Sequence, residues 1–291
     1  MRRLRILIIV FFTVVFTVFA ITRLREYITS DYSAPVIHAE SDSIQVSVNA
    51  GDEELLAGMR ATDNLDGDVS DTLVVVSKSK FINKGQLRVN YAAFDKNNNV
   101  GVAARNLTYT DYHSPRFSLS QPLRFVSGNS SYDYLKFIHA DDCLDGDITR
   151  QIKVTFGSTE STSNTATRQK LNLQVTNSAG DTALIELWAT FEDYTGYSQP
   201  SPALSEYIVY TRQGQKPDYS SYLSGVWIAG NVRKFADIGY NPASDVRISD
   251  SGVNYSVPGV YAVSFQLSHA NSDDSNRIAQ GSTTMYVVVE D

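Results

Sequence analysis

The chain has 291 residues, and its formal net charge at pH 7 is −7. From residue 27 onward, 20 lysines and arginines stand against 31 aspartates and glutamates, which gives this region a formal charge of −11. Such an acidic region argues against a nucleic-acid partner and against adsorption to an anionic lipid surface. The single cysteine, Cys143, excludes an intramolecular disulfide. The length allows two or three domains.

Residues 1–30 differ from everything that follows. Residues 6–22 form an uncharged, almost wholly apolar run, with Arg2, Arg3 and Arg5 before it and Arg23 and Arg25 after it. Seventeen residues of helix span roughly 25 Å, which is at the short end for a bilayer. The run therefore predicts a membrane helix that anchors the protein. The slight excess of arginines before the run predicts a cytoplasmic N-terminus.

A cleaved signal peptide is the alternative interpretation, since Val18-Phe19-Ala20 fits a small-residue cleavage site. The unbroken run of bulky residues and the arginines at both ends favour an anchor that is retained. In both interpretations, residues from about 30 onward lie outside the cytoplasm. An extracytoplasmic protein without a disulfide is ordinary in a bacterial envelope.

The region after residue 30 repeats with a period near 80 residues. The acidic turn DNLDGDVSD, which starts at Asp63, recurs as DCLDGDITR from Asp142. An Asp-Tyr pair recurs at Asp31, Asp111 and Asp193. A solenoid repeat is shorter than this, whereas a small β-sandwich of up to about 100 residues fits. The repeat predicts three domains, each with a core of its own: 31–111, 112–193 and 194–291.

Each copy contains two strands joined by a polar segment. Alternating apolar residues predict the first strand of each pair at 87–93, 171–175 and 261–267. Polar turns follow at 95–99 and 177–181, and a loop follows at 271–276. The returning strands are expected to end near residue 110 and to cover 183–191 and 283–289. One fold is therefore used three times.

The first copy carries a recognisable set of motifs. These are APVI at 34–37, GDEELLAGMRATDNLDGDVSD at 51–71 and KGQLRVNYAAFDKNNNVG at 84–101. Together they resemble the Ig-like domains of bacterial surface proteins, a group that includes modules of some insecticidal crystal toxins and the hyalin-type repeats. The second copy matches at the acidic turn and at NSAGD, and the third matches at VPGVYAVSF. The resemblance implies an all-β fold of three tandem Ig-like β-sandwiches that serve as spacers, stalks or adhesive units.

The acidic turns are the candidate metal sites. Carboxylate oxygens of one turn or the other could surround a calcium ion: Asp63, Asp66 and Asp68, or Asp142, Asp145 and Asp147. The spacing does not match an EF-hand loop. The alternative is a structural Asx turn in which the short side chains bond nearby N–H groups and Gly67 adopts a positive φ. Both interpretations stay open, and neither requires another cofactor.

Nothing in the sequence points to catalysis. The chain has no HExxH motif, no G-x-S-x-G elbow and no phosphate-binding loop, and its four histidines are isolated: His38, His113, His139 and His269. We therefore predict no catalytic residues and a protein that is not an enzyme.

Two functions remain. The first is an adhesive or structural stalk at a bacterial cell surface that binds a protein or a glycan. The second is an accessory subunit of a membrane complex for envelope assembly or secretion. The first is the prediction, and the second is its alternative. Trp188 and Trp227 are interpreted as core or inter-domain residues in preference to ligand contacts. Strand propensity and packing between domains also explain the tyrosines between Tyr194 and Tyr222, and stacking on a sugar or contact with a protein is the alternative.

Overall fold

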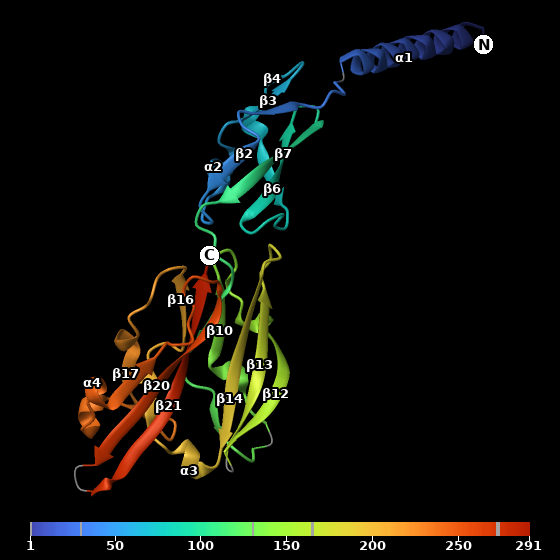
Figure 1. Ribbon diagram of the computed structural model, residues 1–291. Helices are drawn as coiled ribbons and strands as arrows, with labels where there is room; N and C mark the ends of the chain where they lie inside the picture. Colours follow the sequence, from blue (N-terminus) through green and yellow to red (C-terminus); the bar gives the residue numbers. More distant parts are fainter. Residues whose placement is uncertain (1, 30, 130, 164–165, 272–273) are drawn as a thin grey trace. The chain divides into compact units, whose positions relative to one another are not determined.

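The computed structural model describes residues 2–29, 31–129, 131–163, 166–271 and 274–291 (Figure 1). The chain divides into two compact units, one up to Tyr112 and one from His113 to Asp291. Helix α1 (Arg2–Thr29) is followed by β-strands with short helical turns between them. The prediction of an all-β protein behind one N-terminal helix is confirmed.

Helix α1 is long and apolar enough to cross a membrane over Arg3–Tyr27, where the mean hydropathy of the most apolar window is 2.8. A signal sequence passes the same test of length and composition. The hydroxyls of Thr13 and Thr17 donate to the carbonyl oxygens of Ile9 and Thr13, at 2.8 and 2.7 Å. These polar groups are therefore satisfied within the helix, as an apolar surrounding requires.

The first unit contains one β-sandwich. One sheet has the order β1-β3-β4, made of Val36–Ala39, Met59–Asp63 and Gly67–Asp68. The other has the order β2-β7-β6-β5, made of Ser43–Val46, Val100–Tyr109, Gln86–Phe94 and Val74–Lys78. Strands β2 and β7 are parallel, and the other pairs are antiparallel. A short helix, α2 (Asp52–Leu56), joins β2 to β3.

Strand β6 shows why this sequence forms a sandwich. Leu87, Val89 and Tyr91 are buried, whereas Arg88 between them is exposed, as strand alternation requires. The Tyr91 hydroxyl donates to the carbonyl oxygen of Leu55 at 2.9 Å, which satisfies a buried polar group and fastens α2 to the core. The predicted strand at 87–93 and the returning strand, β7, are both confirmed.

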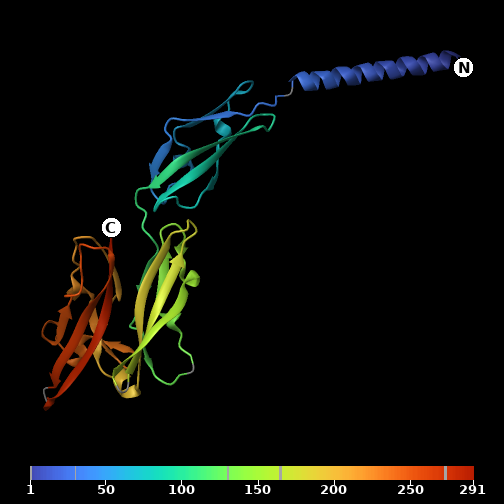
Figure 2. The same ribbon diagram turned by 45° about the vertical axis from the view of Figure 1, so that its right-hand side comes forward.

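The second unit contains two further sheet pairs, which lie side by side in both ribbon views (Figure 2). The sandwich formed by the first pair, called here the second sandwich, has the sheets β11-β10-β8 and β12-β13-β14-β9. Its strands are β8 (Arg116–Leu119), β9 (Arg124–Val126), β10 (Ile138–Asp142), β11 (Gly146–Asp147), β12 (Lys153–Ser163), β13 (Ala166–Thr176) and β14 (Thr182–Glu192).

The third sandwich has the sheets β15-β17-β18 and β16-β21-β20-β19. Its strands are β15 (Ser201–Leu204), β16 (Ile208–Arg212), β17 (Leu223–Ile228), β18 (Asn231–Arg233), β19 (Val246–Ser249), β20 (Gly259–Asn271) and β21 (Asp274–Glu290). Helix α3 (Tyr194–Tyr197) precedes β15, and helix α4 (Pro242–Asp245) precedes β19.

One expectation about the core is corrected. The buried apolar residues of the second unit form a single cluster that extends from Phe117 in the second sandwich to Val289 in the third. Tyr207 and Tyr286 belong to this cluster, and so do Leu171 and Leu187. The two sandwiches therefore share one core, because apolar side chains at their contact leave water together. The domain limits 31–111, 112–193 and 194–291 stay a prediction.

The last hairpin also differs from its prediction. Strand β21 begins at Asp274, inside the predicted loop at 271–276, while residues 272 and 273 lie outside the described part of the chain. The alternating apolar pattern marks only the part of a strand that covers the core. Main-chain pairing extends the hairpin beyond that part, with Leu267 opposite Gly281 and Ala270 opposite Ile278.

Candidate functional site

The first acidic turn connects β3 to β4. Asp63 ends β3, and its Oδ1 atom accepts hydrogen bonds from the N–H groups of Leu65 and Asp66, both at 2.9 Å. Gly67 has φ 75°, the left-handed region that glycine tolerates. These contacts form an Asx turn, which is one of the two arrangements that the sequence allowed. The hydrogen bonds from the N–H groups of Asp66 and Leu65 lower the pKa of Asp63, so its carboxylate is ionised at neutral pH.

The other two carboxylates of this turn have partners as well. Asp66 accepts from the Lys96 N–H group at 2.9 Å and contacts the Lys96 ammonium at 3.0 Å. Asp68 accepts from the Ser70 N–H group at 3.0 Å. The Lys96 N–H and ammonium groups lower the pKa of Asp66, and the Ser70 side chain and N–H group lower the pKa of Asp68. Asp66 therefore joins the acidic turn to the turn between β6 and β7.

The second acidic turn repeats this arrangement between β10 and β11. Asp142 Oδ1 accepts from the N–H groups of Leu144 and Asp145, at 2.9 and 3.1 Å. Asp145 accepts from the N–H and hydroxyl groups of Ser178, at 2.6 and 2.7 Å. Asp147 accepts from the Thr149 N–H group at 2.9 Å. All six aspartates named from the sequence thus accept hydrogen bonds in or beside their turns, and calcium binding by them stays a prediction.

The fold brings Asp63 together with two aspartates that sequence reasoning missed. Oxygens of Asp31, Asp63 and Asp95 lie within 4.8 Å of one another. Asp63 and Asp95 are 8% and 6% exposed, and Asp31 is half-buried. Both missed residues stand inside quoted motifs, Asp31 before the first strand and Asp95 in the turn after β6. The available signal was the repeat, in which Asp31 recurs as Asp111 and Asn177 takes the place of Asp95.

The second sandwich carries an amide in place of one of these carboxylates. Asn177 follows β13 just as Asp95 follows β6. Its Nδ2 atom donates to Asp142 Oδ2 at 3.1 Å. In the second sandwich, the buried aspartate of the acidic turn thus faces an amide that donates a hydrogen bond to it. In the first sandwich, the side chain at the same position is another carboxylate.

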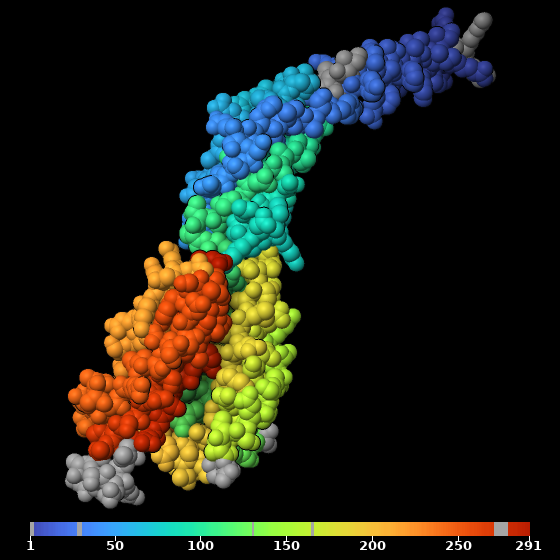
Figure 3. Space-filling view, viewed as in Figure 1, coloured from blue at the N-terminus to red at the C-terminus, as the bar shows by residue number. Residues whose placement is uncertain are grey.

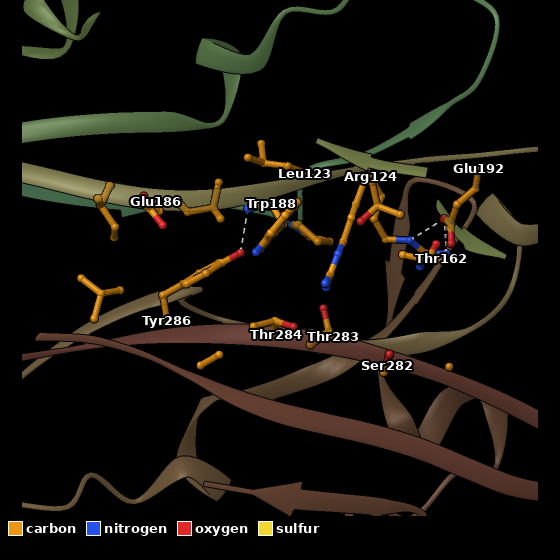
Figure 4. Close-up of a pocket in the computed structure, with 18 of the residues that line it drawn as sticks. Leu123, Arg124, Thr162, Glu186, Trp188, Glu192, Ser282, Thr283, Thr284 and Tyr286 are labelled. Carbon is orange, nitrogen blue, oxygen red and sulfur yellow. Dashed lines mark hydrogen bonds and ion pairs between the residues drawn. The ribbon is translucent and has the colours of Figure 1, made fainter. Parts of the chain in front are cut away.

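A cleft of about 1080 Å³ lies in the second unit, between the second and third sandwiches. The space-filling view shows the two sandwiches side by side (Figure 3). One wall comes mainly from β13 and β14, and the facing wall comes from β20 and β21. The close-up shows Trp188 on one wall and Thr283, Thr284 and Tyr286 on the other (Figure 4).

Charged groups lie beside Trp188, and two of them, Arg168 and Glu186, line the cleft with it. The Arg168 guanidinium lies 4.3 Å from the indole centroid, and the Lys170 ammonium lies 5.4 Å from it. Lys170 also contacts Glu186 at 2.9 Å. Both cations come from β13, and Trp188 comes from β14, where it pairs with Lys170 in the sheet. The wall therefore combines an aromatic ring with groups that donate and accept hydrogen bonds.

Two tyrosines of the third sandwich fasten it to the second. The Tyr286 hydroxyl accepts from the Trp188 N–H group at 2.8 Å, and the Tyr210 hydroxyl accepts from the Phe117 N–H group at 2.7 Å. Burial raises the pKa of each tyrosine to about 12, so both hydroxyls are neutral at physiological pH. Trp188 thus lies where the second sandwich contacts the third.

Arg124 lines the cleft between Trp188 and Glu192 (Figure 4). Its guanidinium donates to Glu192 at 2.9 Å, to the Ser201 hydroxyl at 3.0 Å and to the Gly196 carbonyl oxygen at 2.9 Å. It also lies 4.7 Å from the centroid of the Trp227 ring, which is buried in the third sandwich. One side chain therefore joins β9 and β14 to α3, β15 and β17.

No family model and no curated protein matches the chain. Among solved structures, it is similar to the second carbohydrate-binding module, bound to GlcNAc, and INT domains of Clostridium perfringens ZmpB, with 15% identity and a TM-score of 0.21 over 52% of this chain and 26% of that one. It is also similar to the protocadherin gammaB4 extracellular domain, with 8% identity and a TM-score of 0.22 over 90% and 52% of the two chains. The chain thus spans about half or less of these relatives, and the fold assignment rests on its own strand pairing.

Proposed function

We propose that this protein is a non-catalytic binding protein of the bacterial cell surface. Helix α1 holds it in the membrane, and its β-sandwiches form a stalk that presents a site for a glycan or a protein. The observation that supports this function is the cleft between the second and third sandwiches, where Trp188 lies among charged and hydroxyl-bearing side chains.

The chemistry of the cleft suits a saccharide. A sugar offers an apolar C–H face, which packs on an aromatic ring, and hydroxyls, which pair with charged side chains and amides. Arg168 and Glu186 line the cleft beside Trp188, and Ser282 and Thr284 line the opposite wall. The cleft is open to ligand without a rearrangement of the shared core, so we expect binding with little change of the main chain.

The test is a glycan microarray probed with the full chain in detergent, followed by calorimetric titration of the glycan that is retained. Glu186→Gln is expected to weaken binding roughly tenfold, because a hydrogen bond to a charged group contributes about 1.5–3 kcal/mol. Trp188→Ala is expected to weaken it at least as much. Phe156→Ala is the control, since Phe156 is an aromatic residue 57% exposed outside the cleft.

Unchanged affinity in both cleft variants would place the ligand site elsewhere. If the microarray retains nothing, the same variants are compared in capture of protein partners, and loss of capture in the cleft variants alone would identify a protein ligand. A membrane protein that copurifies in equal amount with the chain, independently of the cleft, would favour the accessory-subunit function.

The anchor itself is tested on membranes from the source cells. We expect the mature protein to begin before residue 6 and to stay in the membrane pellet after extraction at high pH, because the apolar side chains of α1 are exposed and need lipid. External protease should digest residues beyond 30 in intact cells. A mature N-terminus at Ile21 with the protein in the medium would show that the segment is a cleaved signal peptide.

A further inference from the structure

We propose that Asp31, Asp63 and Asp95 bind one calcium ion in the first sandwich. This donor set shares Asp63 with the acidic turn but draws its other two carboxylates from the chain before β1 and from the turn after β6. The proposal does not depend on the ligand in the cleft of the second unit.

The spacing of the three carboxylates fits a single ion. Their oxygens lie within 4.8 Å of one another, and two ligands at 2.3–2.6 Å on opposite sides of one calcium ion are about 5 Å apart. The donors are all oxygens, which suit calcium and magnesium, whereas zinc prefers nitrogen and sulfur. Carboxylates with room for added water oxygens favour calcium, because calcium accepts six to eight ligands in flexible geometry.

Two buried oxygens of the cluster lack a hydrogen-bond partner among the described residues. They are the Oδ2 atoms of Asp31 and Asp63. A buried carboxylate oxygen that has lost water requires a donor or a cation. Asp63 itself is more than nine-tenths buried, and its other oxygen already accepts the two N–H groups of the Asx turn. The turn thus holds this carboxylate in place, with its second oxygen left for a metal.

The nearby positive charge is directed to another carboxylate. Lys96 follows Asp95 directly, yet its ammonium pairs with Asp66. The partner of Asp95 is Asn99, a neutral residue, whose Nδ2 donates to Asp95 Oδ2 at 2.6 Å and to the Asp31 carbonyl oxygen at 2.9 Å. Asn99 orients two members of the cluster and leaves the negative charge in place.

The second sandwich is the natural comparison within the same chain. There, the Asn177 amide occupies the position of Asp95 and donates to the Oδ2 atom of Asp142, the counterpart of Asp63. In the second sandwich, an amide thus provides a partner for the buried carboxylate oxygen. In the first sandwich, the same oxygen would have the ion as its partner. The substitution Asp95→Asn therefore copies a solution that this fold already uses, and it is expected to preserve the first sandwich without calcium.

An ion at this place would join segments far apart in the sequence. Asp31 stands two residues after the end of α1, and Asp63 and Asp95 stand in two turns of the sandwich. Calcium would hold the start of the first sandwich to both turns. We therefore expect the ion to slow amide exchange in the segments around these three residues.

The experiment is equilibrium dialysis of the full chain in detergent against calcium chloride, with hydrogen exchange measured in parallel. The wild-type chain is expected to bind one calcium ion that Asp95→Asn and Asp31→Asn lose, with at least a tenfold fall in affinity. Asp71→Asn is the matched control, because Asp71 is an exposed residue in the same acidic turn and the change removes the same charge. This control is expected to bind as the wild type does.

Slow amide hydrogen exchange in strands β6 and β7 shows that a variant is folded. Two variants of the cluster are made so that the test still stands if one of them does not fold. The proposal is wrong if the wild-type chain binds no calcium at millimolar concentration. It is also wrong if the folded Asp95→Asn variant binds calcium as tightly as the wild type does. The same holds if Asp71→Asn lowers the calcium affinity as much as the cluster variants do. If the carboxylates shared a proton in place of an ion, amide exchange around them would depend on pH and not on calcium. Magnesium that competes at equal concentration would show that the site selects a hard cation without preferring calcium.

Discussion

Replacing Gly101 with alanine is expected to destabilise the first sandwich by about 3 kcal/mol or more. An added Cβ atom would lie 2.0 Å from the Pro35 carbonyl oxygen and 2.8 Å from its carbon. Both atoms belong to the main chain, so relief requires β1 and β7 to move apart. For a domain of this size, the loss corresponds to a fall in melting temperature of roughly 12 °C or more.

The third sandwich supports this expectation from within the chain. Gly281 stands at the equivalent place in β21, and its added Cβ would lie 2.0 Å from the Pro200 carbonyl oxygen. In each case a residue just before the first strand of the sandwich crosses over the glycine. The close approach therefore belongs to the fold itself, and Gly281→Ala should destabilise the second unit in the same way.

Scanning calorimetry of the full chain in detergent measures both effects. Gly51→Ala is the matched control, because a Cβ there meets nothing within 4 Å and the change at this helix N-cap costs no more than about 1 kcal/mol. Equal melting temperatures for Gly101→Ala and Gly51→Ala would contradict the close approach of β1 and β7.

Replacing Arg124 with methionine is expected to destabilise the second unit by about 3 kcal/mol, the typical cost of removing one partner of a buried ion pair. The Arg124 side chain is only 11% exposed, and the change leaves Glu192 without its cation. It also removes the donors to Ser201 and Gly196. The methionine keeps part of the packing on Trp227, so the loss comes mainly from the polar contacts.

Because the second and third sandwiches share one core, they are expected to unfold in one transition that shifts down by roughly 6–12 °C in Arg124→Met. Arg124→Lys should recover only part of the loss, since an ammonium cannot reproduce the planar fork of guanidinium donors. Arg150→Met is the control, because Arg150 is exposed. If the second unit had the same melting temperature in Arg124→Met and Arg150→Met, Arg124 would not hold the two sandwiches together.

Short sequence patterns predicted much of the fold. Alternation along residues 87–93 predicted strand β6, since a strand with one buried face must place its apolar side chains at every second residue. The acidic turns were likewise readable, because an Asx turn involves neighbours two or three residues apart, and glycines at the αL position mark it. Signals of this kind lie within a few residues, so a single sequence suffices.

The candidate sites depended on contacts between distant segments. The sequence named Asp63 but grouped it with Asp66 and Asp68, its neighbours along the chain. The fold instead placed Asp63 against Asp31 and Asp95, each 32 residues away. The sequence placed Asp95 in a turn after a predicted strand, but only the packing of the two sheets brings it to Asp31 and Asp63.

By itself, then, the sequence determined an apolar N-terminal helix, the all-β class and a fold used three times, because hydropathy, alternation and turn chemistry are properties of short segments. Tertiary structure alone decided that the second and third sandwiches share a core, that Arg124 and Tyr286 join them around a cleft, and that three carboxylates meet in the first sandwich. These features arise from side chains far apart in the chain, which come within contact distance only when burial of apolar surface drives the sheets together.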